Sequence, residues 1–156
     1  MPVIFKYLEI GDPVITEKIL RALPDWFGIE EATLEYIQNA TKYPMIVIYE
    51  NNSPVGFISI KSHSSFTSEI YVMGIMPDHH RKGIGEKLLL ESERILALNK
   101  TEYLQVKTLD ESRENEAYRK TRLFYKAMGF REVEVFPTLW GEANPCLLLI
   151  KKIKTS

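Results

Sequence analysis

The sequence predicts an α+β protein with a mixed β-sheet. Apolar residues alternate between the two-residue period of strands and the three-to-four-residue spacing of helices. Helix-ending residues such as Pro24 and Gly129 separate these segments. The segments follow one another in the order β-α-α-β-β-β-α-β-α-β-β. A run of strands followed by a β-α-β core is typical of this class.

Each element has its own local signal. Asp12 can cap a first helix whose opening position is Pro13, and Pro24 stops this helix. The other helices are predicted from apolar side chains at helical spacing. The expected helices cover residues 12–23, 29–42, 85–99 and 115–128. The expected strands cover residues 3–10, 45–50, 55–62, 68–76, 103–109, 130–136 and 146–153.

Two turns link these elements. The sequence Asn-Asn-Ser-Pro at residues 51–54 predicts a hairpin between the second and third strands. Gly129 suits a left-handed cap at the end of the last helix. The sequence contains no repeat, low-complexity tract or long linker, so we expect a single domain over residues 3–153.

The composition limits the class of protein. Of the 156 residues, 45% are hydrophobic and 26% charged, which is enough to bury a core. A net charge of −1 argues against a general nucleic-acid binder. The N-terminus lacks a signal-peptide pattern, and no apolar run approaches the roughly 20 residues of a membrane helix. With Cys146 as its one cysteine, the chain cannot form an intramolecular disulfide. We therefore expect a cytoplasmic protein that does not bind membranes.

The segment His-His-Arg-Lys-Gly-Ile-Gly-Glu-Lys-Leu, residues 79–88, joins a strand to a helix. The first N–H groups of a helix lack partners and attract phosphates, and Gly83 and Gly85 let a ligand approach the backbone. Three side chains add positive charge: Arg81, Lys82 and Lys87. The other interpretation is a tight turn without a ligand. The Walker A pattern fails because no Gly-Lys-Ser/Thr follows at the right distance. The dinucleotide fingerprint fails because its third glycine would stand at position 88, which is Leu88.

This segment resembles the signature of the GNAT family of acyl-CoA-dependent N-acetyltransferases. The family pattern, Gln/Arg-x-x-Gly-x-Gly/Ala between a strand and a helix, matches residues 80–85. The sequences Gly-Ile-Met-Pro before it and Phe-Tyr-Lys-Ala-Met-Gly-Phe after it agree as well, as does the element order. The resemblance therefore covers residues 3–153. His80 stands where the family has Gln or Arg, but backbone N–H groups make most of the family's contacts, so we expect binding to survive.

The resemblance implies a mostly antiparallel sheet flanked by helices, with acetyl-CoA as cosubstrate and no metal. The cofactor's pyrophosphate would lie on backbone N–H groups of Arg81, Lys82, Gly83, Ile84, Gly85 and Glu86. Its pantetheine arm would pair with the backbone of Met73, Gly74 and Ile75. A glycine within a strand, such as Gly74, also fits a bulge or a close backbone approach.

Acetyl transfer to an amine requires a base for the protonated amine. Glu69 lines up with the glutamate base of the histone acetyltransferase branch, and even spacing puts it on one strand face with Tyr71, Met73 and Ile75. We expect apolar neighbours to raise the pKa of Glu69. The alternative is an exposed glutamate at a strand end. His63 is a second base candidate, although a loop histidine is often only solvated, and water is a third.

An acid for the leaving thiolate is the second requirement. Tyr125 matches the general-acid tyrosine of the family, the alternative being an aromatic core residue. By the same resemblance, the segment that holds Trp26 and Phe27 lines the acceptor pocket, unless both are ordinary core aromatics. The residues expected at the acceptor pocket are Trp26, Phe27, His63 and Tyr71.

Two features receive structural interpretations. Cys146 lies in a buried strand pattern and has no paired histidine, so we expect an inert buried thiol. His79 and His80 are adjacent and lack further spaced ligands, so they do not predict a metal site.

The sequence thus predicts an enzyme that moves an acetyl group from acetyl-CoA to a primary amine by direct attack in a ternary complex. The acceptor is a small-molecule or peptide amine, not a nucleic acid. Many family members dimerise, so a homodimer is among the expected states. A non-catalytic acyl-CoA sensor or scaffold module is the alternative from another class. A domain for another phosphate ligand is the third.

Overall fold

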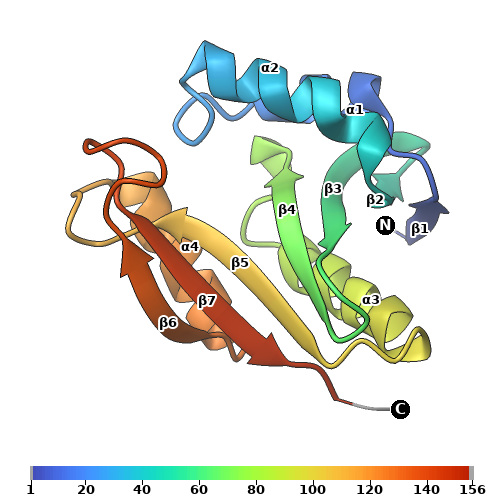
Figure 1. The fold of residues 1–156 in the computed structure, drawn as a ribbon. Helices are drawn as coiled ribbons and strands as arrows, with labels where there is room; N and C mark the ends of the chain where they lie inside the picture. The colour runs from blue at the N-terminus through green and yellow to red at the C-terminus, as the bar shows by residue number, and fades with distance from the viewer. Residues whose placement is uncertain (1, 155–156) are drawn as a thin grey trace. The chain divides into compact units, whose positions relative to one another are not determined.

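The computed structural model describes residues 2–154 and confirms the predicted α+β class (Figure 1). Within that range, seven strands and four α-helices follow the predicted order. The strands are β1 (Val3–Leu8), β2 (Met45–Glu50), β3 (Ser53–Ser62), β4 (Thr67–Ile75), β5 (Tyr103–Leu109), β6 (Arg131–Phe136) and β7 (Cys146–Lys152). The helices are α1 (Pro13–Arg21), α2 (Glu30–Asn39), α3 (Ile84–Leu98) and α4 (Glu116–Ala127). Two short 3-10 helices, η1 (Ala40–Lys42) and η2 (Pro77–His79), were not predicted.

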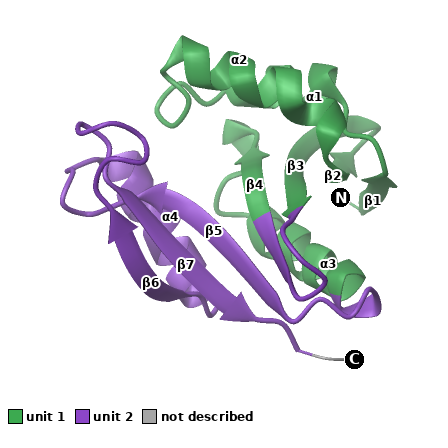
Figure 2. Cartoon of the chain, in the orientation of Figure 1, with its two compact units in different colours: residues 1–61, 70–96 green, residues 62–69, 97–156 purple. Residues whose placement is uncertain are grey.

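The strands neighbour one another in the order β1-β2-β3-β4-β5-β7-β6. The pairs β1–β2, β2–β3, β5–β7 and β6–β7 are antiparallel, which agrees with the predicted mostly antiparallel sheet. The chain forms two compact units (Figure 2). Unit 1 comprises the chain up to Lys61 together with Ile70–Leu96, and unit 2 comprises Ser62–Glu69 and the chain from Ala97 onward. The single-domain organisation over residues 3–153 stays a prediction.

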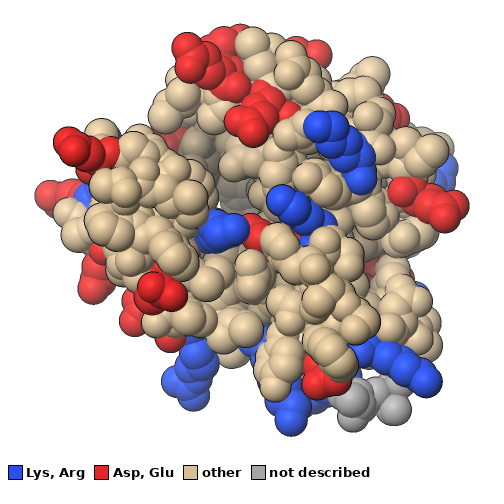
Figure 3. Space-filling view, viewed as in Figure 1, with Lys and Arg blue, Asp and Glu red and all other residues tan. Residues whose placement is uncertain are grey.

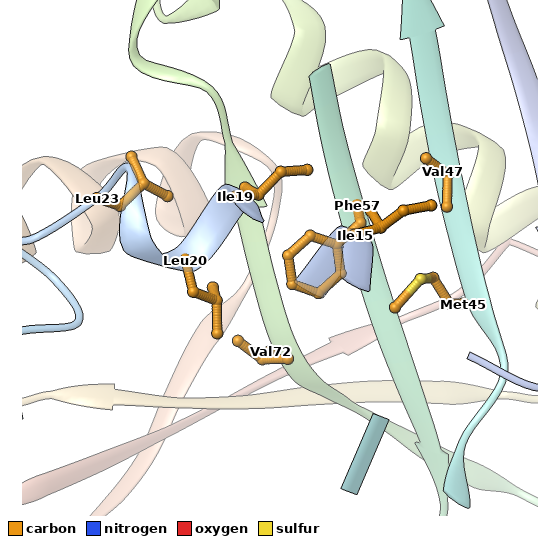
Figure 4. Packing of buried hydrophobic residues seen from close by; sticks show 8 residues of the cluster. All are labelled: Ile15, Ile19, Leu20, Leu23, Met45, Val47, Phe57 and Val72. Atoms are coloured by element: carbon orange, nitrogen blue, oxygen red, sulfur yellow. The ribbon is translucent and has the colours of Figure 1, made fainter. Parts of the chain in front are cut away.

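Helix α1 begins as its sequence predicts. The Asp12 carboxylate accepts hydrogen bonds from the N–H groups of Val14 and Ile15, at 2.8 and 3.4 Å, and Pro13 occupies the first turn. The apolar face of α1 packs into the core of unit 1 (Figure 4). Burying one such large side chain stabilises the fold by roughly 1.5–3 kcal/mol. The core consists of Ile15, Ile19, Leu20, Leu23, Met45, Val47, Phe57 and Val72.

The predicted hairpin of unit 1 is present. Asn51 and Asn52 connect β2 to β3 with φ angles of 52° and 65°. Asparagine adopts this left-handed conformation more readily than most residues, and two such residues in a row suit a tight hairpin turn. The turn, together with a register shift between Ile48 and Tyr49, places Val47 opposite Phe57. Both side chains thereby join the unit 1 core, against which α1 packs.

Gly74 of β4 lies where α1 comes close to the strand. A Cβ atom at this position would lie 2.9 Å from Cγ2 of Ile19 and 3.2 Å from Cδ1 of Leu23. Real Cβ atoms rarely come this near to other side chains, so only glycine fits without a shift of these side chains or of the helix. The crowding at Gly74 comes from side chains, so the expected bulge or close backbone approach stays a prediction.

Unit 2 is built on β5, β7 and β6, with α4 against β5. The Asn115 side chain caps α4 by accepting from the N–H of Tyr118 at 3.1 Å. The helix ends at Ala127, and Gly129 just beyond it has a φ of 100°, which confirms the predicted left-handed cap. Within α4, the buried Arg122 donates from Nη1 to the carbonyl oxygen of Leu109 at 2.7 Å. This bond fixes the helix to the end of β5.

Candidate functional site

The glycine loop of unit 1 runs from the end of η2 to the start of α3. Arg81 and Gly83 have φ angles of 64° and 75°, which turn the chain sharply before the helix. The first intrahelical bond runs from the N–H of Lys87 to the carbonyl of Gly83 at 3.0 Å. The N–H groups of Ile84 and Gly85 therefore precede the helical ladder and have no carbonyl one turn back to bond.

Space beside this loop is open. A Cβ atom added at Gly83 would meet no other atom within 4 Å. Glycine is therefore favoured here by its backbone conformation and not by crowding. An open approach, unused N–H groups and the basic side chains Arg81, Lys82 and Lys87 together suit a phosphate group.

His80 ties this loop to the rest of unit 1. Its Nε2–H group donates to the carbonyl oxygen of Ile75, 2.7 Å away, at the end of β4. Its ring also meets the ring of Trp26 edge-on, with centroids 5.6 Å apart. Sequence comparison with the family pattern left this side chain without a role, because the family has Gln or Arg there. In the structure, this side chain has a structural role: it holds the loop against the end of β4.

The neighbouring His79 is held differently. Its Nε2 lies 3.1 Å from Oε1 of Glu50, while its Nδ1 is buried with no hydrogen-bond partner among the described residues. Within residues 2–154, no group of three or more His, Cys, Asp or Glu side chains is arranged to hold a metal ion.

The β4 residues Met73, Gly74 and Ile75 immediately precede the loop. Met73 and Ile75 are half-buried, whereas Val72 and Gly74 are buried, which fits the two-residue period of a strand. Their role toward a pantetheine arm stays a prediction.

Glu69, the first base candidate, lies at the centre of a hydrogen-bonded cluster within unit 2. Its Oε1 atom lies 2.6 Å from Nε2 of His63 and accepts from Nε2 of Gln105 at 3.1 Å. Nζ of Lys107 lies 3.2 Å from both carboxylate oxygens. The structure therefore brings the two base candidates, Glu69 and His63, into direct contact. Sequence reasoning missed Gln105 and Lys107, although their alternation along β5 places both on one strand face.

The electrostatics of Glu69 correct the expectation that its pKa is raised. Burial does push the pKa of this carboxyl upward, but the hydrogen bonds from His63, Lys107 and Gln105 and the charge of Lys107 outweigh it. The net pKa is below the ordinary glutamate value. The interpretation as an exposed glutamate also fails, because Glu69 is buried.

Tyr125 lies in the last turn of α4 and is buried. Its ring lies edge-on to those of Phe124 and Phe130, with centroids 5.4 and 5.3 Å away. Its carbonyl accepts from the N–H of Phe130 at 3.0 Å, where the chain turns at Gly129. These contacts fix the ring, and an acid role for the hydroxyl stays a prediction.

Two of the acceptor-pocket residues expected in unit 1, Phe27 and Tyr71, belong to one aromatic region. Phe27 contacts Tyr36 with ring centroids 5.9 Å apart, and Tyr36 contacts Tyr71 at 5.2 Å. Asn39 donates from its side-chain amide to the Tyr71 hydroxyl at 2.9 Å. Phe27 and Tyr71 are thus linked through Tyr36, whereas Trp26 packs beside His80. Trp26, Phe27 and Tyr71 also pack against the unit 1 core, and their role at an acceptor pocket stays a prediction.

Cys146 is buried at the start of β7, as expected for a structural thiol. Burial raises the pKa of this thiol to about 11, with a further rise from the Glu69 charge and an opposing effect of Lys107. At neutral pH the thiol is protonated and weakly nucleophilic.

Two further features concern the molecule beyond the site. On the face drawn in Figure 3, basic and acidic side chains are interspersed among uncharged ones. No helix within residues 2–154 is both long and apolar enough to cross a membrane.

Comparison with known proteins assigns these elements to a family. The sequence model described as an acetyltransferase (GNAT) domain matches residues 41–132, which include β4, the glycine loop, α3 and β5. No curated protein sequence matches the chain significantly.

Solved structures share the fold. A Desulfovibrio desulfuricans protein described as a GNAT-family acetyltransferase superposes with a TM-score of 0.82 at 16% identity, over 98% of this chain and all of that one. The Escherichia coli ribosomal-protein-S18-alanine N-acetyltransferase gives 0.75 at 16% identity, over 99% and 96% of the two chains. An aminoglycoside 6'-N-acetyltransferase complexed with coenzyme A gives 0.73 at 17% identity, over 98% of each chain.

Proposed function

Since this chain belongs to the GNAT acetyltransferase family, we propose that it is an N-acetyltransferase that moves an acetyl group from acetyl-CoA to a primary amine. The observation that carries the proposal is the glycine loop at the start of α3, inside the matched region. Its role in the proposal is to bind the cosubstrate's pyrophosphate.

The loop residues fit such a group. The backbone of Gly83 is open to an incoming ligand, and the N–H groups of the first helical turn lack helical partners. Arg81, Lys82 and Lys87 add positive charge. The coenzyme A complex of a structural neighbour supports acetyl-CoA as the cosubstrate. Pairing of the pantetheine arm with Met73, Gly74 and Ile75 is part of the same proposal.

The chemistry is assigned to groups of unit 2. The amine arrives mostly protonated at neutral pH and must lose a proton before it attacks the thioester carbon. The proposal assigns this proton transfer to the Glu69–His63 pair. Oε1 of Glu69 and Nε2 of His63 lie 2.6 Å apart. Attack forms the C–N bond in a ternary complex, and loss of the C–S bond releases a thiolate. The Tyr125 hydroxyl is proposed to donate a proton or a hydrogen bond to that thiolate.

The names of the structural neighbours suggest two classes of amine acceptor, which we include in the proposal. One is named for the alanine of a ribosomal protein and another for an aminoglycoside, so peptide and small-molecule amines are both candidates. The first screen therefore uses a peptide with N-terminal alanine and an aminoglycoside. A cytoplasmic location and a homodimer also stay predictions, and light scattering of the purified protein tests the second.

Calorimetric titration of the purified protein with acetyl-CoA, beside ATP and NAD, tests the proposal. Gly83→Glu is the test variant and Gly141→Glu its matched control. Both glycines have positive φ, at 75° and 88°, and open surroundings, so the two variants carry the same strain and the same added charge. We expect acetyl-CoA to bind to wild type and to Gly141→Glu but not to Gly83→Glu.

Two other outcomes contradict the proposal, and a third, equal loss in both variants, points to misfolding of the variants. Tighter binding of ATP or NAD than of acetyl-CoA would indicate a site for another phosphate ligand. Binding of acetyl-CoA without acetylation of any amine would leave the rival function, a non-catalytic acyl-CoA sensor.

Tyr125→Phe tests the acid separately. Phenylalanine keeps the ring contacts with Phe124 and Phe130 and removes only the hydroxyl. If the hydroxyl assists the thiolate, kcat falls while the affinity for acetyl-CoA is unchanged. An unaltered kcat would return Tyr125 to the aromatic core.

A further inference from the structure

We propose that Nδ1 of His63 is the atom that accepts the amine proton, and that Glu69 and Lys107 are positioning residues that orient His63. This inference rests on the proposed acetyl transfer and goes beyond it, because it identifies which member of the Glu69–His63 pair is the base. All of the residues that carry it belong to unit 2.

Glu69 is poorly placed to accept a proton itself. Its Oε1 atom has three partners, His63, Gln105 and Lys107, at 2.6, 3.1 and 3.2 Å, and Lys107 also reaches Oε2 at 3.2 Å. Protonation of this carboxyl would weaken its ion pair with Lys107 and compete with these hydrogen bonds. The cluster therefore stabilises the ionised form.

An ionised Glu69 determines the tautomer of His63. A carboxylate can only accept, so Nε2 of His63 must carry the proton that lies between Nε2 and Oε1. In a neutral imidazole the lone pair is then on Nδ1. A carboxylate behind a histidine orients the ring and stabilises the imidazolium that forms when the ring accepts a proton.

His63 is also the more accessible member of the pair. Its side chain is 35% exposed, compared with 8% for Glu69. An amine can reach the ring directly or through one water, and the ring can later return its proton to solvent.

The loop that carries His63 is firmly held. The N–H groups of His63 and Ser64 donate to the carbonyl of Thr67 at 3.0 and 3.2 Å. The Ser64 hydroxyl accepts from the N–H groups of Phe66 and Thr67 at 3.1 and 3.2 Å. The carbonyl of Phe66 accepts from the N–H of Tyr103 at the start of β5, 3.0 Å away. These bonds argue against the interpretation of His63 as a freely solvated loop histidine.

One ammonium proton passes to Nδ1 of His63, which gives an imidazolium paired with Glu69. The amine nitrogen attacks the thioester carbon, the C–N bond forms and the C–S bond breaks. The second nitrogen proton ends on the thiolate sulfur, and His63 releases its own proton to solvent. The net products are the N-acetyl amine, free coenzyme A thiol and one proton.

Four variants test the inference: His63→Gln, Glu69→Gln, Lys107→Met and the control Lys152→Met. Lys152 lies at the exposed end of β7, so its replacement removes the same charge from the same unit without touching the cluster. Acetyl-CoA affinity and transfer to the two screening amines are measured for each. We expect kcat/KM to fall by about 100-fold or more in His63→Gln, as for the loss of a general base, with unchanged acetyl-CoA affinity. Glu69→Gln and Lys107→Met lose less, and Lys152→Met loses nothing.

Two further readouts separate a base from a structural residue. Methoxyamine is already neutral at neutral pH, so transfer to it should be far less sensitive to His63→Gln than transfer to a basic amine. Nitrogen-15 NMR of the free wild-type protein should show His63 with its proton on Nε2, and Glu69→Gln should mix the two tautomers.

The outcomes are distinguishable. An active wild type with an undiminished His63→Gln variant, or a wild-type proton on Nδ1, would overturn the inference and leave the proposed function standing. A wild type that acetylates none of the amines would overturn both. Equal losses with methoxyamine and with basic amines would assign His63 a purely structural role.

Discussion

His80 donates from Nε2 to the backbone carbonyl oxygen of Ile75, 2.7 Å away, and so joins the start of the glycine loop to the end of β4. The same ring meets Trp26 edge-on. One side chain thus connects the strand proposed to bind the pantetheine arm, the loop proposed to bind the pyrophosphate and the aromatic segment after α1. The loop's shape therefore depends on this imidazole as well as on the glycines.

Replacement of His80 by alanine should weaken the loop. One hydrogen bond contributes about 0.5–1.5 kcal/mol, and the Trp26 contact adds to it, so we expect a loss of about 1–2 kcal/mol in unfolding free energy. Acetyl-CoA affinity should fall several-fold because a mobile loop must be ordered on binding. His80→Gln, which restores a family residue and a donor, should lose less of both. Urea unfolding and calorimetry measure the two effects, and identical behaviour of His80→Ala and wild type would refute the tie.

Addition of a single methyl group at Gly74 should destabilise unit 1. Its Cβ would lie 2.9 Å from Cγ2 of Ile19, and overpacking of this kind costs about 1–3 kcal/mol. If the clash is the cause, the double variant Gly74→Ala with Ile19→Ala should cost less than the sum of the two single changes. Urea titration of all four proteins measures this coupling. Strict additivity would mean that the methyl group clashes with something else.

Cys146 should resist alkylation in the folded protein. Burial raises the pKa of its thiol to about 11, so little thiolate exists at about pH 8, and the sulfur is also covered. Iodoacetamide should label it rapidly only after unfolding in urea. Mass spectrometry of samples quenched at intervals follows the reaction. Fast labelling without denaturant would show that the start of β7 opens readily.

Acid should weaken the contribution of the Glu69 cluster to stability. The folded pKa of Glu69 lies below its unfolded value of about 4.3, so this contribution is present above that pH and is lost as the pH falls through the folded pKa. Lys107→Met removes one cause of the low pKa. Its cost, about 1.5–3 kcal/mol at neutral pH, should therefore shrink as the pH falls below about 4.

Urea unfolding of wild type, Lys107→Met and Lys152→Met over this pH range measures the effect. Lys152→Met should follow the wild type throughout. A stability gap between wild type and Lys107→Met that stays constant with pH would show that Lys107 acts through packing and not through the charge of Glu69.

The sequence predicted most elements to within a few residues because their signals are local. The Asp12 cap, the Asn51–Asn52 turn and the Gly129 cap each involve residues only a few positions apart. The two 3-10 helices were missed because a single turn leaves too short a pattern. The glycine loop was found because its residues are contiguous and lie at a strand–helix joint.

By itself, the sequence determined the element order, the position of the glycine loop and the residue types available for chemistry. Only the tertiary structure decided what surrounds them. Glu69 has its partners Gln105 and Lys107 36 and 38 residues away, and these reverse the expected direction of its pKa shift. The pairing of His63 with Glu69 depends on a loop that folds back onto β5. Spacing along a strand predicts which face a residue shares, but the charges that a neighbouring strand brings to that face are set by the sheet's register, which no local pattern encodes.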